Sequence, residues 1–90
     1  MSDVARQVLI ANRRGLHARA SAKFVTLAAS QPCEVSVDKD GNAVTGTSIM
    51  GLMMLGAAMG DTITISADGP DAEAVVGTMC ALVEAKFGED

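Results

Sequence analysis

The chain has 90 residues, of which 49% are hydrophobic and only two are aromatic, and its formal net charge is −4. This length favours a single domain over residues 1–90 with a modest aliphatic core, and the scarcity of aromatic side chains argues against binding nucleic acid by base stacking. No signal peptide or membrane span is evident, and the two cysteines have neither a zinc nor a redox spacing, so we expect a soluble cytoplasmic protein with two buried thiols and no metal or cofactor.

Alternating apolar and polar residues predict four strands, and apolar stripes at helical spacing predict three helices. The expected elements are a strand over 6–11, a helix over 18–29, strands over 33–37 and 43–45, a helix over 49–55, a strand over 62–67 and a helix over 70–87. The last three residues, 88–90, are expected to be frayed. This order indicates the α+β class, with a four-stranded antiparallel sheet covered on one face by three helices.

Charge is distributed unevenly along the sequence. Residues 4–33 contain five cations and no acid, which amounts to +5, and the remaining residues amount to −9. A basic patch on an acidic body suits an anionic ligand or an acidic protein partner, whereas nucleic-acid binding usually requires a basic domain.

The only histidine, His17, lies among these cations. Gly15 permits a backbone reversal and helix formers begin at Ala18, so His17 is expected at the start of a helix. The first amides of a helix have no internal partners and carry the positive end of its dipole, which favours an anion there. The surrounding cations are Arg13, Arg14, Arg19 and Lys23. To accept a phosphoryl group, a histidine needs a nitrogen that is largely unprotonated near neutral pH, and an unperturbed imidazole, with a pKa of about 6.5, meets this requirement. The resulting hypothesis is a histidine that carries a phosphoryl group.

Two separated motifs stand out: residues 15–19, GLHAR, after the first strand, and residues 48–53, SIMGLM, in the middle of the chain. Together they resemble the HPr family, the histidine phosphocarriers of the bacterial phosphotransferase system. The resemblance implies an open-faced β-sandwich in which Nδ1 of His17 receives a phosphoryl group from phosphorylated enzyme I and passes it to a histidine of an enzyme IIA protein. It also implies that Arg19 contacts the phosphate and that Ser48 is the target of a regulatory HPr serine kinase/phosphorylase.

Two positions depart from the pattern of the family. Ala20 stands where the family usually has proline after the motif arginine, and Thr47 stands where it often has lysine before the regulatory serine. We expect the first change to alter the rate of transfer, and the second to affect recognition by the serine kinase.

We also expect a monomer that docks its partners through these residues: Arg14, Lys23, Ile49, Leu52 and Met53.

An alternative hypothesis is a non-catalytic α+β module that uses the arginine-rich patch to bind a free anion or an RNA backbone, with no chemistry at His17. A free-standing enzyme is less favoured, because the single histidine has no orienting acid beside it in the sequence and no evident enclosed pocket. Ser48 is expected to cap the helix that follows it in any of these cases.

Overall fold

The computed structural model describes residues 3–89, which contain four strands, three α-helices and a short 3₁₀ helix. In chain order the elements are β1 (Asp3–Leu9), α1 (Ala18–Ala29), β2 (Val35–Lys39), β3 (Asn42–Thr45), α2 (Ile49–Met54), β4 (Thr62–Asp68), α3 (Ala72–Glu84) and η1 (Lys86–Gly88). The strands form one antiparallel sheet with the order β1-β4-β2-β3. The predicted order of elements is therefore confirmed.

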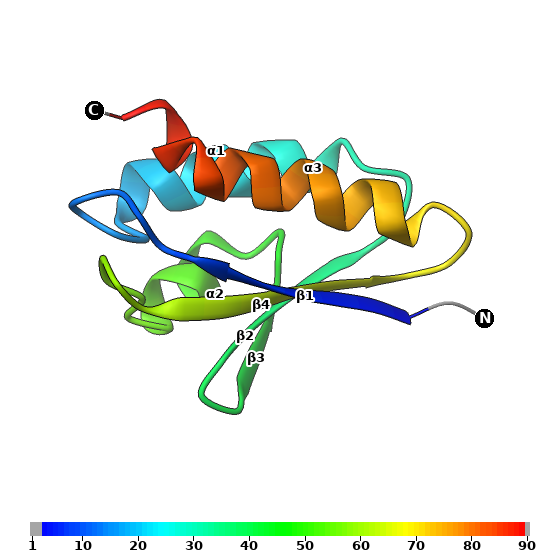
Figure 1. Cartoon of the computed structure of the whole chain (residues 1–90), viewed down its shortest axis with the longest axis horizontal. Coiled ribbons are helices and arrows are strands. Elements are labelled where there is room, and N and C mark those ends of the chain that lie inside the picture. The colour runs from blue at the N-terminus through cyan, green and yellow to red at the C-terminus, as the bar shows by residue number, and fades with distance from the viewer. Residues whose placement is uncertain (1–2, 90) are drawn as a thin grey trace.

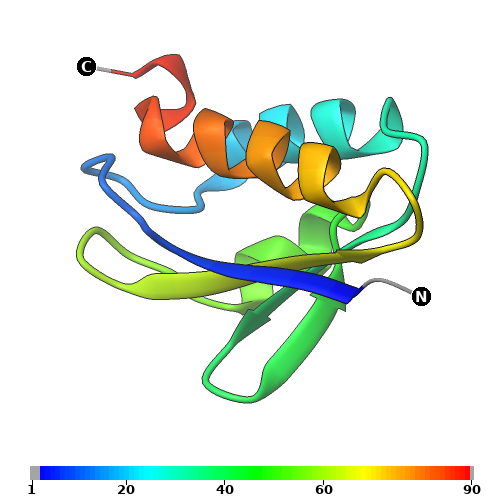
Figure 2. The ribbon, with the colours of Figure 1, turned by 45° about the vertical axis from the view of Figure 1, so that its right-hand side comes forward.

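The helices lie over one face of this sheet. Helices α1 and α3 run side by side above the strands in both views (Figures 1 and 2), and α2 contacts α1 and β3. The alternation along β4 reflects this one-sided cover, since Ile63 and Ile65 face the helices and are buried while Thr62 is exposed. The predicted α+β class, with a sheet covered on one side by three helices, is confirmed.

The core is aliphatic apart from two phenylalanines. Phe24 of α1 and Phe87 of η1 are almost completely buried, at 0% and 1% exposure. Helix α3 adds a buried stripe that includes Val75, Met79 and Val83. Because Phe87 belongs to this core, the chain is anchored to the body of the protein almost to its C-terminal end.

Some element boundaries differ from the prediction. Strand β1 begins at Asp3, three residues before the predicted start, because pairing with β4 extends to Asp68. Helix α3 ends at Glu84, before the predicted end at Phe87. Lys86 and Phe87 have φ values of 58° and 55°, a left-handed conformation that cannot continue an α-helix.

The two cysteines differ in environment. Cys80 is fully buried in α3, and this burial raises the pKa of its thiol, whereas Cys33 is only partly buried. The prediction of two buried thiols is therefore right for one of them. Among residues 3–89, no helix is long and apolar enough to cross a membrane, and no group of three or more acidic, cysteine or histidine side chains is placed to hold a metal ion.

Candidate functional site

His17 is the N-cap residue of α1. Its backbone is extended, with φ −71° and ψ 177°, and its carbonyl accepts a hydrogen bond from the N–H of Ser21 at 2.9 Å. The side chain is also part of the cap, because Nδ1 accepts a hydrogen bond from the backbone N–H of Arg19 at 3.2 Å. The prediction that His17 lies at the start of a helix is confirmed, and Nδ1 faces the unpaired amides of the first turn.

The turn before His17 is packed tightly against the loop that follows α2. Gly15 has a φ of 63°, and a Cβ atom there would lie 2.3 Å from the carbonyl oxygen of Ala57. The N–H of Leu16 donates to that same oxygen at 2.9 Å. Glycine is required here both for the left-handed backbone and for the close approach of the two loops.

Asn12 supports this turn from inside. Its side chain is completely buried, and Nδ2 donates one hydrogen bond to the carbonyl of Gly15 at 2.8 Å and another to Oε1 of Glu89 at 3.0 Å. No role was predicted for Asn12 from the sequence. Asparagine before a glycine turn was the available signal, because its amide can bond nearby backbone groups, but its contact with Glu89 has no local signature.

Glu89 completes the site from the C-terminal end of the chain. Its Oε2 atom lies 2.5 Å from Nε2 of His17, so one carboxylate contacts both Asn12 and His17. The expectation of a frayed tail is wrong for residues 88 and 89, whereas Asp90 lies outside the described residues. The buried ring of Phe87 holds the tail, and Nζ of Lys23 donates to the Phe87 carbonyl at 2.8 Å.

The contacts of Glu89 favour its ionised form. The hydrogen bond from Asn12 is the largest cause that lowers the pKa of this carboxyl below its usual value, and the hydrogen bond from His17 is the second. Partial desolvation acts in the opposite direction, and the positive charge of Arg14 adds a smaller lowering effect. The side chain is therefore a carboxylate at neutral pH and acts as an acceptor for both of its partners.

Arginines surround His17 in space as they do in sequence. A surface hollow of about 340 Å³ is lined by Arg13, Arg14, His17, Arg19 and Glu89. Three arginines and one carboxylate give this hollow an excess of positive charge. It can therefore receive an anion next to the first turn of α1.

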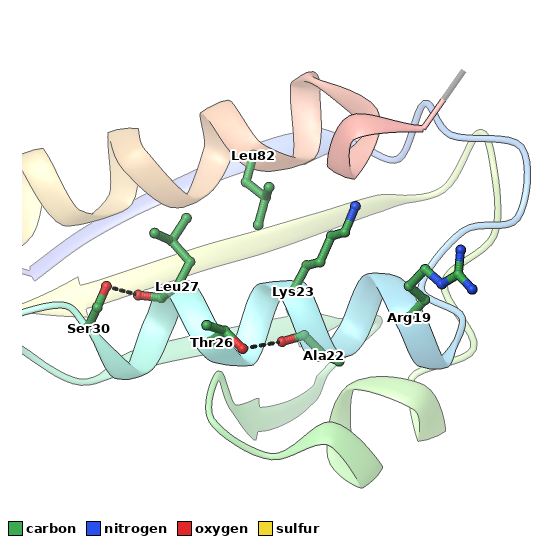
Figure 3. Close-up of a pocket in the computed structure, with 7 residues that line it drawn as sticks. All are labelled: Arg19, Ala22, Lys23, Thr26, Leu27, Ser30 and Leu82. Carbon is green, nitrogen blue, oxygen red and sulfur yellow. Dashed lines mark hydrogen bonds between the residues drawn. The ribbon is translucent and has the colours of Figure 1, made fainter.

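Lys23 lies one turn further along α1 and points towards the C-terminal segment, whereas Arg19 extends from the first turn (Figure 3). A larger hollow of about 540 Å³ lies between α1 and α3, where Leu27 and Leu82 face each other (Figure 3). The hydroxyls of Thr26 and Ser30 along it already donate to carbonyls of α1. This groove, which we call the α1–α3 groove, is also lined by Arg19 and Lys23 but not by His17, so it is not the candidate site.

The residues of α2 that were expected to dock partners do not share one environment. Ile49 and Met53 are 42% and 40% exposed, but Leu52 is completely buried in the core. The expectation that Leu52 contacts partners is therefore corrected. Helix α2 has six residues and is apolar on nearly every side, so the sequence pattern could not show which side faces inward.

Ser48 is the N-cap residue of α2, as predicted. Its backbone is extended and its Oγ accepts a hydrogen bond from the N–H of Gly51 at 2.9 Å. The side chain is partly exposed. Because α2 contacts α1, Ser48 begins a helix that is adjacent to the one that His17 begins.

Comparison with known proteins agrees with this geometry. A family model described as "PTS HPr component phosphorylation site" matches residues 4–85. The phosphocarrier protein NPr of Shewanella violacea is 43% identical over 89 residues, covering 99% of this chain and 98% of that protein. The phosphocarrier protein HPr of Cupriavidus necator is 44% identical over 84 residues, covering 93% and 94%. A crystal structure of HPr from Thermoanaerobacter tengcongensis matches with a TM-score of 0.88 and 40% identity, covering 100% of this chain and 99% of the other.

The fold and these matches define a phosphocarrier of the phosphotransferase system. Within that class, the chain belongs to the HPr family, as its two sequence motifs indicated.

Proposed function

We propose that His17 accepts a phosphoryl group on Nδ1 from phosphorylated enzyme I and passes it to an enzyme IIA protein. The observation that carries this proposal is the position of Nδ1 at the N-terminus of α1, where the Arg19 N–H reaches it at 3.2 Å. Once phosphate is on Nδ1, the amides of the first turn can donate to its oxygens instead of to the ring.

Arg19 supplies the second contact in this proposal. Arg19 lines the same hollow as His17, and its guanidinium can offset the negative charge of the phosphoryl group. The hollow lies at the surface and is not an enclosed pocket, so stabilisation of the phosphorylated form is only partial. This suits a carrier, because a group that is held too strongly would not be released to the next protein.

Mass spectrometry of the intact protein after incubation with enzyme I and phosphoenolpyruvate tests this function. We expect a gain of one phosphoryl group that survives base and is lost in acid, and no gain in His17→Ala. The variant should remain folded, because a cap contributes only about 0.5–2 kcal/mol. A wild-type chain that gains no mass would favour an anion-binding module without chemistry, and transfer by His17→Ala would exclude His17 as the acceptor.

The downstream branch and the regulation of transfer belong to the same proposal. Relatives named HPr and NPr match at nearly the same identity, so sugar-uptake and nitrogen-type enzyme IIA proteins should both be assayed as acceptors.

We further propose that the protein acts as a monomer and that a serine kinase modifies Ser48. Ser48 is partly exposed and begins the helix that carries the exposed Ile49 and Met53, which supports a modification that changes docking.

A further inference from the structure

The two ring nitrogens of His17 have different partners, and these partners define one tautomer. Nδ1 accepts a hydrogen bond from the Arg19 N–H, which requires a lone pair on Nδ1. Nε2 lies 2.5 Å from Oε2 of Glu89, and a carboxylate can only accept a hydrogen bond. A neutral imidazole has one N–H, so both contacts are satisfied only when the hydrogen is on Nε2.

We propose that Glu89 is a positioning residue for phosphotransfer at His17. By accepting the Nε2–H bond, Glu89 keeps the proton away from Nδ1 and holds the ring with the Nδ1 lone pair available to phosphorus. This inference rests on the proposed function of His17 and deepens it with a residue 72 positions further along the chain. It also supplies the orienting acid that the neighbouring sequence lacks.

The same contact acts during the transfer step. The Nδ1 lone pair forms a bond to phosphorus while the bond between phosphorus and the donor atom breaks, and that electron pair stays with the donor. The Nε2 proton remains on the ring, which gains positive charge as Nδ1 becomes bonded. A carboxylate at Nε2 stabilises this charge without taking the proton, as the buried acid does in a serine–histidine–aspartate triad.

Glu89 is itself held in place, as a positioning residue must be. Asn12, which is completely buried, donates to the other carboxylate oxygen at 3.0 Å and fixes the plane of the group. Phe87 anchors the backbone two residues before, and Lys23 binds the Phe87 carbonyl. The bonds from Asn12 and His17 also lower the pKa of Glu89, which keeps it ionised at neutral pH.

The geometry favours positioning over obstruction. Glu89 contacts Nε2 and leaves Nδ1 to the helix amides, so the tail does not occupy the nitrogen that is proposed to accept phosphorus. Its negative charge would repel an incoming phosphoryl group, but three arginines line the same hollow and offset that repulsion.

Glu89→Ala and Glu89→Gln test the proposal, with Glu84→Ala and Glu84→Gln as matched controls. Glu84 is an exposed carboxylate at the end of α3, so its variants remove the same charge away from His17. The first measurement is the ¹⁵N NMR spectrum of the imidazole at about pH 9, where a free imidazole is neutral. We expect the Nε2–H tautomer in the wild type and both controls, a mixture in Glu89→Ala, and retention in Glu89→Gln, whose amide oxygen still accepts a hydrogen bond.

The second measurement is transfer from phosphorylated enzyme I. In Glu89→Ala we expect kcat to fall about tenfold, equivalent to about 1.4 kcal/mol, while KM stays within about twofold of the wild type. Glu89→Gln should recover part of kcat, because it keeps the hydrogen bond and loses the charge. Both Glu84 variants should match the wild type.

Three outcomes would overturn the proposal: an unchanged tautomer in Glu89→Ala, an unchanged kcat, or a higher kcat, which would mean that the tail obstructs the site. Failure of the proposed function looks different, since the wild type would then gain no phosphoryl group at His17. The tautomer spectra need no phosphoryl donor, so they still decide whether Glu89 sets the state of the ring.

Discussion

Replacing Gly15 with alanine tests how closely the turn before His17 must approach the loop after α2. The φ of 63° places an L-residue in a left-handed conformation, which costs about 1–2 kcal/mol. The new Cβ would also lie 2.3 Å from the Ala57 carbonyl oxygen and 2.9 Å from the Ala58 Cα, and relieving such an overlap costs about 1–3 kcal/mol more. We therefore expect the free energy of unfolding to fall by about 2–5 kcal/mol.

Gly56→Ala is the matched control for this substitution. Gly56 has a φ of 64°, but a Cβ atom there would meet nothing within 4 Å, so only the backbone cost of about 1–2 kcal/mol remains. Urea unfolding followed by far-ultraviolet circular dichroism measures both variants, and this method suits a chain without tryptophan or tyrosine. Equal losses in Gly15→Ala and Gly56→Ala would refute the argument from close approach, because strain alone would then explain both.

Three further predictions concern the charges and caps around the site. Arg19→Ala should slow phosphotransfer about 10- to 100-fold, as expected for one lost hydrogen bond from a charged group. Arg19→Lys should recover only part of the rate, because a point charge lacks the planar fork of a guanidinium. A wild-type rate for Arg19→Ala in stopped-flow transfer assays would assign the role to another arginine. Ser48→Ala should lower the free energy of unfolding by about 1 kcal/mol and leave transfer nearly normal, because only the helix cap is lost. Ser48→Asp should raise KM for enzyme I. A wild-type KM for the Asp variant at low salt, where repulsion is least screened, would contradict a docking switch. The contribution of the Glu89 carboxylate to tail binding should be complete above pH 4.5, its ordinary pKa, and should be lost as the pH falls through its lowered pKa. An NMR titration of the carboxyl carbon that gives a midpoint above 4.5 would contradict this sign.

Local signals in the sequence were sufficient for most of the fold and for half of the site. Helix α1 has the predicted bounds because an apolar stripe, a preceding glycine turn and a proline at position 32, which cannot continue a helix, are all local features. His17 and Ser48 cap their helices for the same reason. The rest of the site depends on tertiary contact, which has no local pattern.

The tail is the clearest example of such a tertiary contact. Glu89 lies in a short polar segment without periodicity, and its partners are 72 and 77 positions away in the sequence. The burial of Phe87, the left-handed turn at Lys86 and Phe87, and the hydrogen bonds from Lys23 and Asn12 direct the chain back to His17. The prediction that Leu52 contacts partners was wrong for a different reason, because a short apolar helix has no polar face to indicate which residues are exposed.

The return of the tail to His17 also decides where this protein can be fused or immobilised. A tag, dye or surface linker joined after Asp90 would be separated by a single residue from Glu89, whose carboxylate contacts the imidazole. Strand β1 begins at the opposite end of the molecule from the C-terminal segment, as Figures 1 and 2 show. Reporter fusions and biosensor surfaces that must keep the histidine environment native should therefore use the amino-terminal end.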